Sequence, residues 1–209
     1  MTFAEMPYQR PDLAALKADY NAITARLRAA ASYADARAAF LDNDTLERRI
    51  TTQATLASIR HSIDTRDAFY DGEKKFWNAA DPELQACRDE FTAALLESPF
   101  RADFAAEYGD LMFQNAEIAR KAFSPEIVPD LQKENDLAQE YEKLLASAQI
   151  PFEGGVYTLS PLSPYKTDAD DARRLAAWKA EGRWFKENQP KMDEIYDQLV
   201  HLRDGMGKK

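Results

Sequence analysis

The side chains with the widest chemical range in this chain are two histidines and one cysteine. His61 and His201 lie 140 positions apart, and Cys87 stands between them. A zinc-activated water held on a helix needs two histidines four residues apart with a glutamate between them. No His-Glu-x-x-His sequence occurs in the chain. The sequence therefore excludes a helix-borne zinc site of this kind, and the chain by itself should be catalytically inactive.

The residues around each histidine leave several roles open. His61 has neighbours at helical spacing and can be a ligand, a substrate contact or a structural group. We favour the structural role, since no second ligand donor is near it in the sequence. Arg60 and Asp64 are one turn apart, which predicts an ordinary ion pair on a helix surface. Asp197 precedes His201 by one turn and can orient its ring or face solvent.

Other site chemistries fail on residue types and spacing. A di-iron bundle needs Glu-x-x-His on two helices, whereas the residues three before the histidines here are serine and glutamine. A single cysteine excludes intrachain disulfides and zinc sites built from several cysteines. Nothing in the sequence holds two carboxylates across a cleft, as acid–base catalysis requires. We expect the acidic pairs to be helix caps and loop residues: Asp42–Asp44 and Asp170–Asp171.

Charge and hydropathy limit the partners of this protein. With 36 acidic and 27 basic side chains the net charge is −9, which repels phosphate backbones and anionic membranes. No window approaches the ~18 apolar residues of a membrane span. The first residues lack the apolar core of a signal peptide. We therefore expect no nucleic acid or membrane partner, and a cytoplasmic location.

Apolar residues recur every three or four positions along nearly all of the 209 residues, which predicts an all-α, multi-helix lobe. A break is expected near Asp42–Asp44, a distorted turn at Pro129, and a helix end at Gly109. Capping residues and prolines predict the helix starts, at Pro11-Asp12, Ser32, Asp81-Pro82, Ser124-Pro125, Asp168–Asp170 and Pro190.

The helical spacing stops once, near residues 150–160, in the segment IPFEGGVYTLSPLSPY. Gly154-Gly155 can form a turn, and the apolar residues on either side suit a pleated strand. Pro161 and Pro164 exclude a long central strand. One small β-hairpin is therefore predicted. The glycine pair is not followed by the lysine of a phosphate-binding loop, so a nucleotide site is not expected.

Large aromatic side chains are numerous, and we expect them to pack between helices in the core. This group consists of Phe69, Tyr70, Phe76, Trp77, Trp178, Trp184 and Phe185. The alternative is that Trp184 or Tyr165 lines a peptide channel.

Two stretches of the chain resemble a known family. The first runs from Phe123 to Trp178 and places the hairpin segment between two helices, the second of which begins at DADDARR. The second runs from Thr55 to Phe76, TLASIRHSIDTRDAFYDGEKKF. Both resemble the N-terminal half of the oligoendopeptidase F group of thimet-oligopeptidase-like zinc metallopeptidases. The resemblance extends from about Pro11 to Lys208.

The resemblance implies a helical lobe with a small hairpin that forms one wall of a deep channel for short unfolded peptides. It implies zinc as the cofactor of the full-length family, held in a catalytic half that is absent here. No catalytic or metal-binding residue can then be assigned to this chain, and its substrate-binding residues are unknown. It further implies that residues 1–189 are the N-terminal lobe and that residues 190–209 begin the catalytic domain.

Partners and rival functions follow from the same residues. Short peptides, bound through the complete enzyme, and the missing catalytic domain are the partners that the resemblance implies. Self-association is also predicted, because no following helix covers the wide apolar face of Ile195, Leu199, Leu202 and Met206, with Tyr196 and Val200 beside it. The alternative is a free-standing helical module that binds peptides or proteins. An orphan bundle with its own active site is disfavoured by the failed metal patterns.

Overall fold

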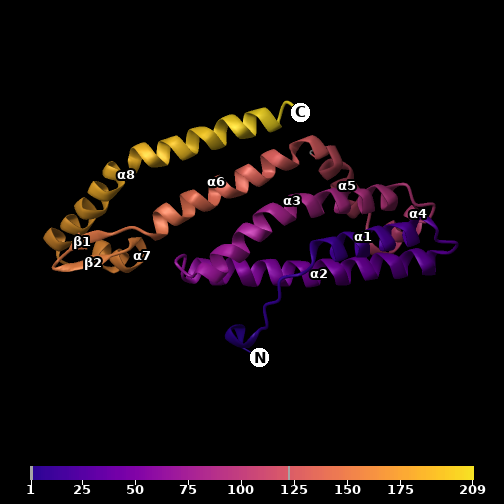
Figure 1. Cartoon of the computed structure of the whole chain (residues 1–209), viewed down its shortest axis with the longest axis horizontal. Helices are drawn as coiled ribbons and strands as arrows, with labels where there is room; N and C mark the ends of the chain where they lie inside the picture. Colours follow the sequence, from indigo (N-terminus) through magenta and orange to yellow (C-terminus); the bar gives the residue numbers. More distant parts are fainter. Residues whose placement is uncertain (1, 122) are drawn as a thin grey trace. The chain divides into compact units, whose positions relative to one another are not determined.

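The computed structural model describes residues 2–121 and 123–209 (Figure 1). It divides into two compact units, which we call the first unit, Met1–Pro129, and the second unit, Asp130–Lys209. The described residues form helices and one two-stranded antiparallel sheet. The predicted all-α fold with a single small hairpin is therefore confirmed. No helix among the described residues is long and apolar enough to cross a membrane.

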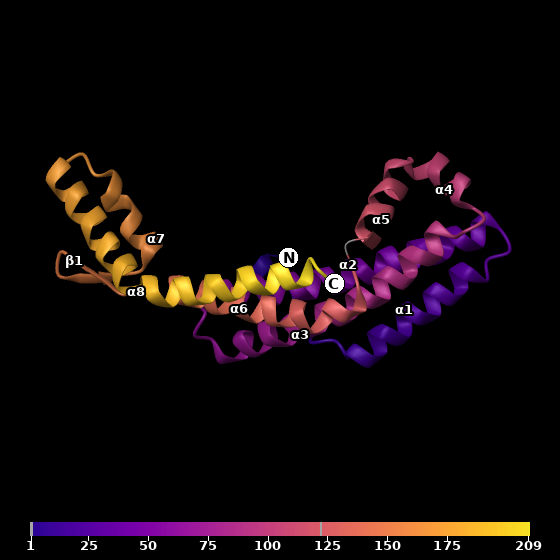
Figure 2. The same ribbon diagram turned by 90° about the horizontal axis from the view of Figure 1, so that it is seen from above.

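The first unit is built on three long helices that lie side by side (Figures 1 and 2). Its elements are a 3₁₀ turn η1 (Phe3–Glu5), α1 (Leu13–Arg28), α2 (Tyr33–Ile63), α3 (Ala68–Leu96), α4 (Arg101–Tyr108) and α5 (Leu111–Lys121). One continuous apolar core joins these helices. Its most deeply buried large side chains are Tyr20, Ile50, Leu84, Phe104 and Phe113.

Several predicted helix ends are confirmed by their capping contacts. The Asp12 carboxylate caps α1 by accepting hydrogen bonds from the backbone N–H groups of Ala14 and Ala15. Ser32 caps α2 in the same manner. Gly109 follows α4 with φ of 89°, a left-handed backbone conformation that glycine adopts without steric cost. These caps fix where the helices begin and end.

The predicted breaks within α2 and α3 are wrong. Helix α2 continues through Asp42–Asp44, because Asp42 binds Arg26 of α1 at 2.6 Å and does not compete for its own backbone. Helix α3 continues through Pro82, and the Asp81 carboxylate binds Arg88 instead of capping a new helix. An interior proline costs a helix about 3 kcal/mol. Packing offsets that cost here, since Pro82 is buried in the core side of α3.

The chain reaches the second unit through a capped turn. Ser124 caps the 3₁₀ turn η2 (Pro125–Ile127), and α6 (Val128–Ala146) follows at once. Pro129 is the second residue of α6, where a backbone N–H has no intrahelical acceptor. The predicted start at Ser124-Pro125 is confirmed, and the 3₁₀ turn is the irregular geometry expected near Pro129.

The second unit combines the hairpin with one long helix. Its remaining elements are β1 (Ile150–Phe152), β2 (Gly155–Tyr157), α7 (Leu159–Leu162), a 3₁₀ turn η3 (Ser163–Thr167) and α8 (Asp171–Met206). The hairpin and α7 pack on the first half of α8 around Ile150, Phe152, Leu162 and Trp184. Asp170 caps α8 as predicted. Helix α8 continues through Pro190, so the predicted helix start there is wrong; α8 bends along its length in Figures 1 and 2.

The prediction that the apolar face near the end of α8 is exposed is wrong for its central residues. Ile195 is fully buried and Leu199 is 7% exposed, because both pack on Leu137 of α6. Leu202 and Met206 are half-buried. Helix α6 precedes the hairpin, and after the hairpin the second half of α8 runs back alongside α6 (Figure 1). Helix α6 therefore covers this face of α8. The apolar side chains that stay exposed on this part of α8 are Tyr196 and Val200.

The hairpin turn lies one residue earlier than predicted. Its two central residues are Glu153 and Gly154, with φ of 47° and 79°, which is the positive-φ pair of a type I′ turn. Gly155 is instead the first residue of β2. A Cβ atom on Gly155 would lie 2.8 Å from the Tyr157 ring, so the small residue is needed for this close approach.

Candidate functional site

His61 is enclosed between two helices of the first unit. It lies in α2 and is 1% exposed, and its Nε2 is 3.6 Å from an Asp71 carboxylate oxygen in α3. Asp71 also binds Lys75 at 3.0 Å. A buried ring held against a neighbouring helix fits the structural role that the sequence favours for His61.

His201 is exposed on α8, in the second unit. Its Nδ1 lies 2.7 Å from the backbone carbonyl oxygen of Asp197, so the main chain rather than the carboxylate of that residue orients the ring. The two histidines thus belong to different units. Within residues 2–121 and 123–209, no group of three histidine, cysteine, aspartate or glutamate side chains can hold a metal ion. The donors among these described residues do not form a set that fits zinc.

Arg60 fastens the N-terminal segment to the helices of the first unit. It donates hydrogen bonds to the carbonyl oxygen of Met6 at 2.6 Å and to the hydroxyl of Tyr70 at 2.9 Å. Its guanidinium also lies over the rings of Phe3 and Tyr70. Asp64 accepts from Arg66 instead. The predicted Arg60–Asp64 surface pair is therefore wrong.

The first unit holds a buried carboxylate that no sequence pattern predicts. Glu73 of α3 is 3% exposed and accepts hydrogen bonds from the guanidinium of Arg10 and the hydroxyl of Tyr8. Trp77 Nε1 donates to the same hydroxyl at 3.1 Å. The hydrogen bonds from Arg10 hold the pKa of Glu73 below its usual value, while burial and the carboxylate raise the pKa of Tyr8.

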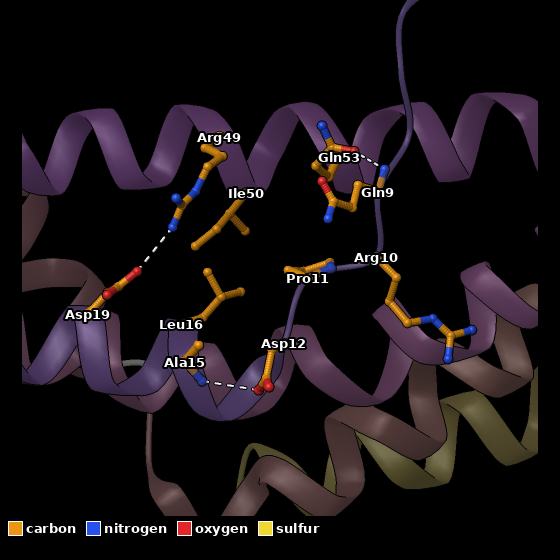
Figure 3. Close-up of a pocket in the computed structure, with 10 residues that line it drawn as sticks. All are labelled: Gln9, Arg10, Pro11, Asp12, Ala15, Leu16, Asp19, Arg49, Ile50 and Gln53. Atoms are coloured by element: carbon orange, nitrogen blue, oxygen red, sulfur yellow. Dashed lines mark hydrogen bonds and ion pairs between the residues drawn. The ribbon is translucent and has the colours of Figure 1, made fainter.

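A pocket of about 330 Å³ opens where the N-terminal segment meets α1 and α2 (Figure 3). Leu16 and Ile50 form its apolar floor. Arg49 pairs with Asp19 at 3.1 Å on one side, and the Gln53 side chain accepts from the backbone N–H of Gln9 on the other. The volume is at the lower end for small-molecule sites. An apolar floor with a polar rim suits one short side chain rather than a large ligand.

The second unit holds a nearly buried ion pair beside an exposed indole. Lys166 and Glu181 approach to 2.5 Å, with side-chain exposures of 15% and 10%. The Lys166 ammonium also lies 4.7 Å from the centre of the Trp178 ring, and the Trp178 N–H donates to the Lys166 carbonyl. Trp178 is nevertheless 53% exposed. These contacts orient the indole and leave one of its surfaces to solvent.

The aromatic side chains divide between core and surface. Trp77 and Trp184 are buried, as predicted, and Trp184 belongs to the apolar cluster around the hairpin. Tyr165 is half-buried and packs on Phe152 and Tyr157. The prediction of core packing is wrong for three aromatic residues. Phe69 is 57% exposed, Trp178 is 53% exposed and Phe185 is 37% exposed.

Comparison with solved structures covers the entire chain. A crystal structure described as an oligoendopeptidase F matches all of it with a TM-score of 0.97 and 41% identity, and one from Bacillus anthracis str. Ames matches all of it with 0.96 and 36%. A structure of PZ peptidase A with an inhibitor matches 99% of the chain, with a TM-score of 0.96 and 37% identity.

The match covers only part of each solved chain. This chain spans only 37% to 38% of the length of these solved chains. No curated protein matches it. The family model for the peptidase M3 N-terminal domain matches residues 3–123, which is more than half of the chain. This protein therefore belongs to the M3 peptidase family, to whose N-terminal portion it corresponds.

Proposed function

We propose that this chain is the N-terminal, substrate-channel lobe of a zinc metalloendopeptidase that hydrolyses short peptides. The observation that carries the proposal is the superposition of 99% to 100% of the chain, hairpin unit included, on two structures described as oligoendopeptidase F and on PZ peptidase A, at TM-scores of 0.96 to 0.97. In this proposal zinc and the catalytic residues belong to a partner part outside the 209 residues, and short peptides reach them through the complete enzyme. Residues 1–189 act as the lobe and residues 190–209 lead into the catalytic part.

Both units expose large apolar side chains that a further domain can cover. In the first unit Ile63, Leu111 and Ile118 are 65% to 73% exposed. In the second unit Leu175, Trp178 and Phe185 lie on one side of α8, at spacings of three and seven residues, and all are exposed. An exposed apolar stripe such as the one on α8 is typical of a site that another protein surface covers. A catalytic domain is the occupant that this proposal supplies.

Two secondary parts of the proposal have their own support. A cytoplasmic location is supported by the single cysteine, because oxidising compartments favour disulfide-rich chains. Self-association of the isolated chain stays a prediction, which Tyr196 and Val200 support by their exposure. Sedimentation velocity at rising concentration measures it.

The coding sequence beyond Lys209 tests the proposed function. An in-frame continuation, or a neighbouring gene, that encodes His-Glu-x-x-His is the expected result. A stop codon with no such coding sequence nearby would instead favour the free-standing binding module.

A further inference from the structure

In the hairpin of the second unit, one edge of each strand is hydrogen-bonded to the other strand, and the second edge is open. Strand β1 pairs with β2 in the register Ile150 with Tyr157, Pro151 with Val156, and Phe152 with Gly155. In the part of the chain that the structure describes, no third strand joins this sheet. The sheet therefore presents two edges, and their backbone groups differ.

The turn and the proline together fix which backbone groups point outward. A two-residue turn closes on a hydrogen-bonded pair, here Phe152 with Gly155, and the pairs of an antiparallel ladder alternate along it. Pro151 with Val156 is therefore the non-hydrogen-bonded pair, which is the only position where a residue without an N–H leaves the ladder intact. It follows that the N–H and the C=O of Val156 both point away from β1.

The two edges are thus unequal. The outer edge of β1 offers the carbonyl of Pro151 but no N–H, so it cannot form the paired donor and acceptor contacts of a strand. The outer edge of β2 offers both groups at Val156. Val156 is 61% exposed, so it is open to solvent. Tyr157 and Phe152 pack together on the other face of the hairpin.

We propose that the outer edge of β2 docks an extended peptide substrate through the backbone N–H and C=O of Val156. This inference rests on the proposed function, because it names the place where this lobe holds the peptide. A donor and an acceptor on one residue match the backbone of an extended chain and select no side chain. Only one such residue lies on this three-residue strand, so binding is weak and reversible, which suits a substrate that must leave after cleavage. The net charge of −9 favours peptides with basic ends.

The direct test measures the amide of Val156 in the ¹⁵N-labelled 209-residue chain. The probe is the heptapeptide acetyl-Lys-Thr-Val-Thr-Val-Thr-Lys-amide. On saturation, hydrogen exchange at the Val156 amide should slow about tenfold, as expected for one new hydrogen bond of ordinary strength. Exchange at Val156 that stays unchanged while the peptide binds elsewhere would overturn the inference and leave the proposed function intact.

Two variants separate the backbone contact from the side chain. Val156→Pro removes the outward N–H without breaking a hydrogen bond of the hairpin, since this position makes none within it, and it should weaken binding about tenfold. Val156→Thr keeps the N–H and should bind as the parent chain does. Equal binding by all three chains contradicts the proposal.

A third arm leaves the protein unchanged, so it does not depend on how the variants fold. Two versions of the same peptide carry N-methyl groups on alternate residues, one along one edge of the extended peptide and the other along its opposite edge. Each version loses strand pairing along its methylated edge alone. One of the two methylated peptides should fail to bind the unaltered chain, and the other should bind. Equal binding by both overturns the proposal. Protection of Val156 by the catalytic part before peptide is added would also overturn it, because another segment would then occupy the edge.

Discussion

Arg10 holds the Glu73 carboxylate through two atoms of its guanidinium, although 63 residues separate them in the sequence. The contacts are 2.5 Å from Nη2 and 2.9 Å from Nε. The two side chains differ in exposure, at 50% for Arg10 and 4% for Glu73. A carboxylate enclosed in α3 therefore depends on the N-terminal segment for its partners. This contact ties the chain at Arg10 to α3 of the first unit.

Replacement of Arg10 should destabilise the first unit. In Arg10→Ala the buried carboxylate of Glu73 keeps only the hydrogen bond from Tyr8, and we expect a loss of about 1–3 kcal/mol in the free energy of unfolding. Urea denaturation followed by circular dichroism measures it. Arg48→Ala is the matched control, because Arg48 is 79% exposed in its pair with Asp44. Equal midpoints for the two variants would show that the Arg10 contact contributes little.

The same contact should make stability depend on pH. Since folding lowers the pKa of Glu73, its stabilisation is fully present above the unfolded value of about 4.3. It is lost as the pH falls through the lower folded value. The difference in unfolding free energy between the parent chain and Glu73→Gln should therefore be largest near neutral pH and shrink below about pH 4. A difference that stays constant down to pH 3 would argue against a charged Glu73.

Two glycines should respond oppositely to alanine. A Cβ at Gly155 would lie 2.8 Å from the Tyr157 ring, so Gly155→Ala must displace a ring that packs on Phe152 and should cost about 1–3 kcal/mol. Gly182 lies inside α8 with no heavy atom within 4 Å of such a Cβ. Gly182→Ala should stabilise by about 0.5–1 kcal/mol, the helix propensity difference. Thermal unfolding of both variants decides, and a gain for Gly155→Ala contradicts the close approach.

The chain should bind no zinc at a specific site. A structural or catalytic zinc needs three or four placed ligands, and the two histidines here lie in different units. After dialysis against buffer containing zinc and then against zinc-free buffer, the metal content should fall to the background of the buffer. Stoichiometric zinc that disappears in a His61→Ala His201→Ala double variant would refute this expectation.

The sequence predicted the helices and the hairpin because both depend on local patterns. It placed the start of a new helix at Pro82 and at Pro190, since a proline behind an acidic or polar residue has the same appearance at a helix start and inside a long helix. Pro82 lies inside α3 because it is buried there, and burial depends on tertiary packing rather than on the local sequence. The turn moved by one residue because a type I′ turn needs two positive φ values and Glu153 adopts one of them.

Contacts between distant segments could not be predicted. The cover that α6 provides for Ile195 and Leu199 depends on how the chain folds back after the hairpin. Glu73 has no sequence signal that pairs it with Arg10, because neither residue belongs to a spaced pattern. The resemblance to oligoendopeptidases did predict the family, since it rested on long ordered segments of residues.

Reconstitution of peptidase activity tests the central claim most directly. The catalytic remainder of the Bacillus anthracis relative, expressed without its N-terminal portion, is mixed with this 209-residue chain and zinc, and cleavage of a short fluorogenic peptide is measured. The account predicts cleavage by the mixture, none by either part alone, and loss of cleavage with a chelator. The relative's own N-terminal portion serves as the positive control. If that control restores activity while this chain neither restores it nor binds the remainder, the proposed role as a peptidase lobe is contradicted.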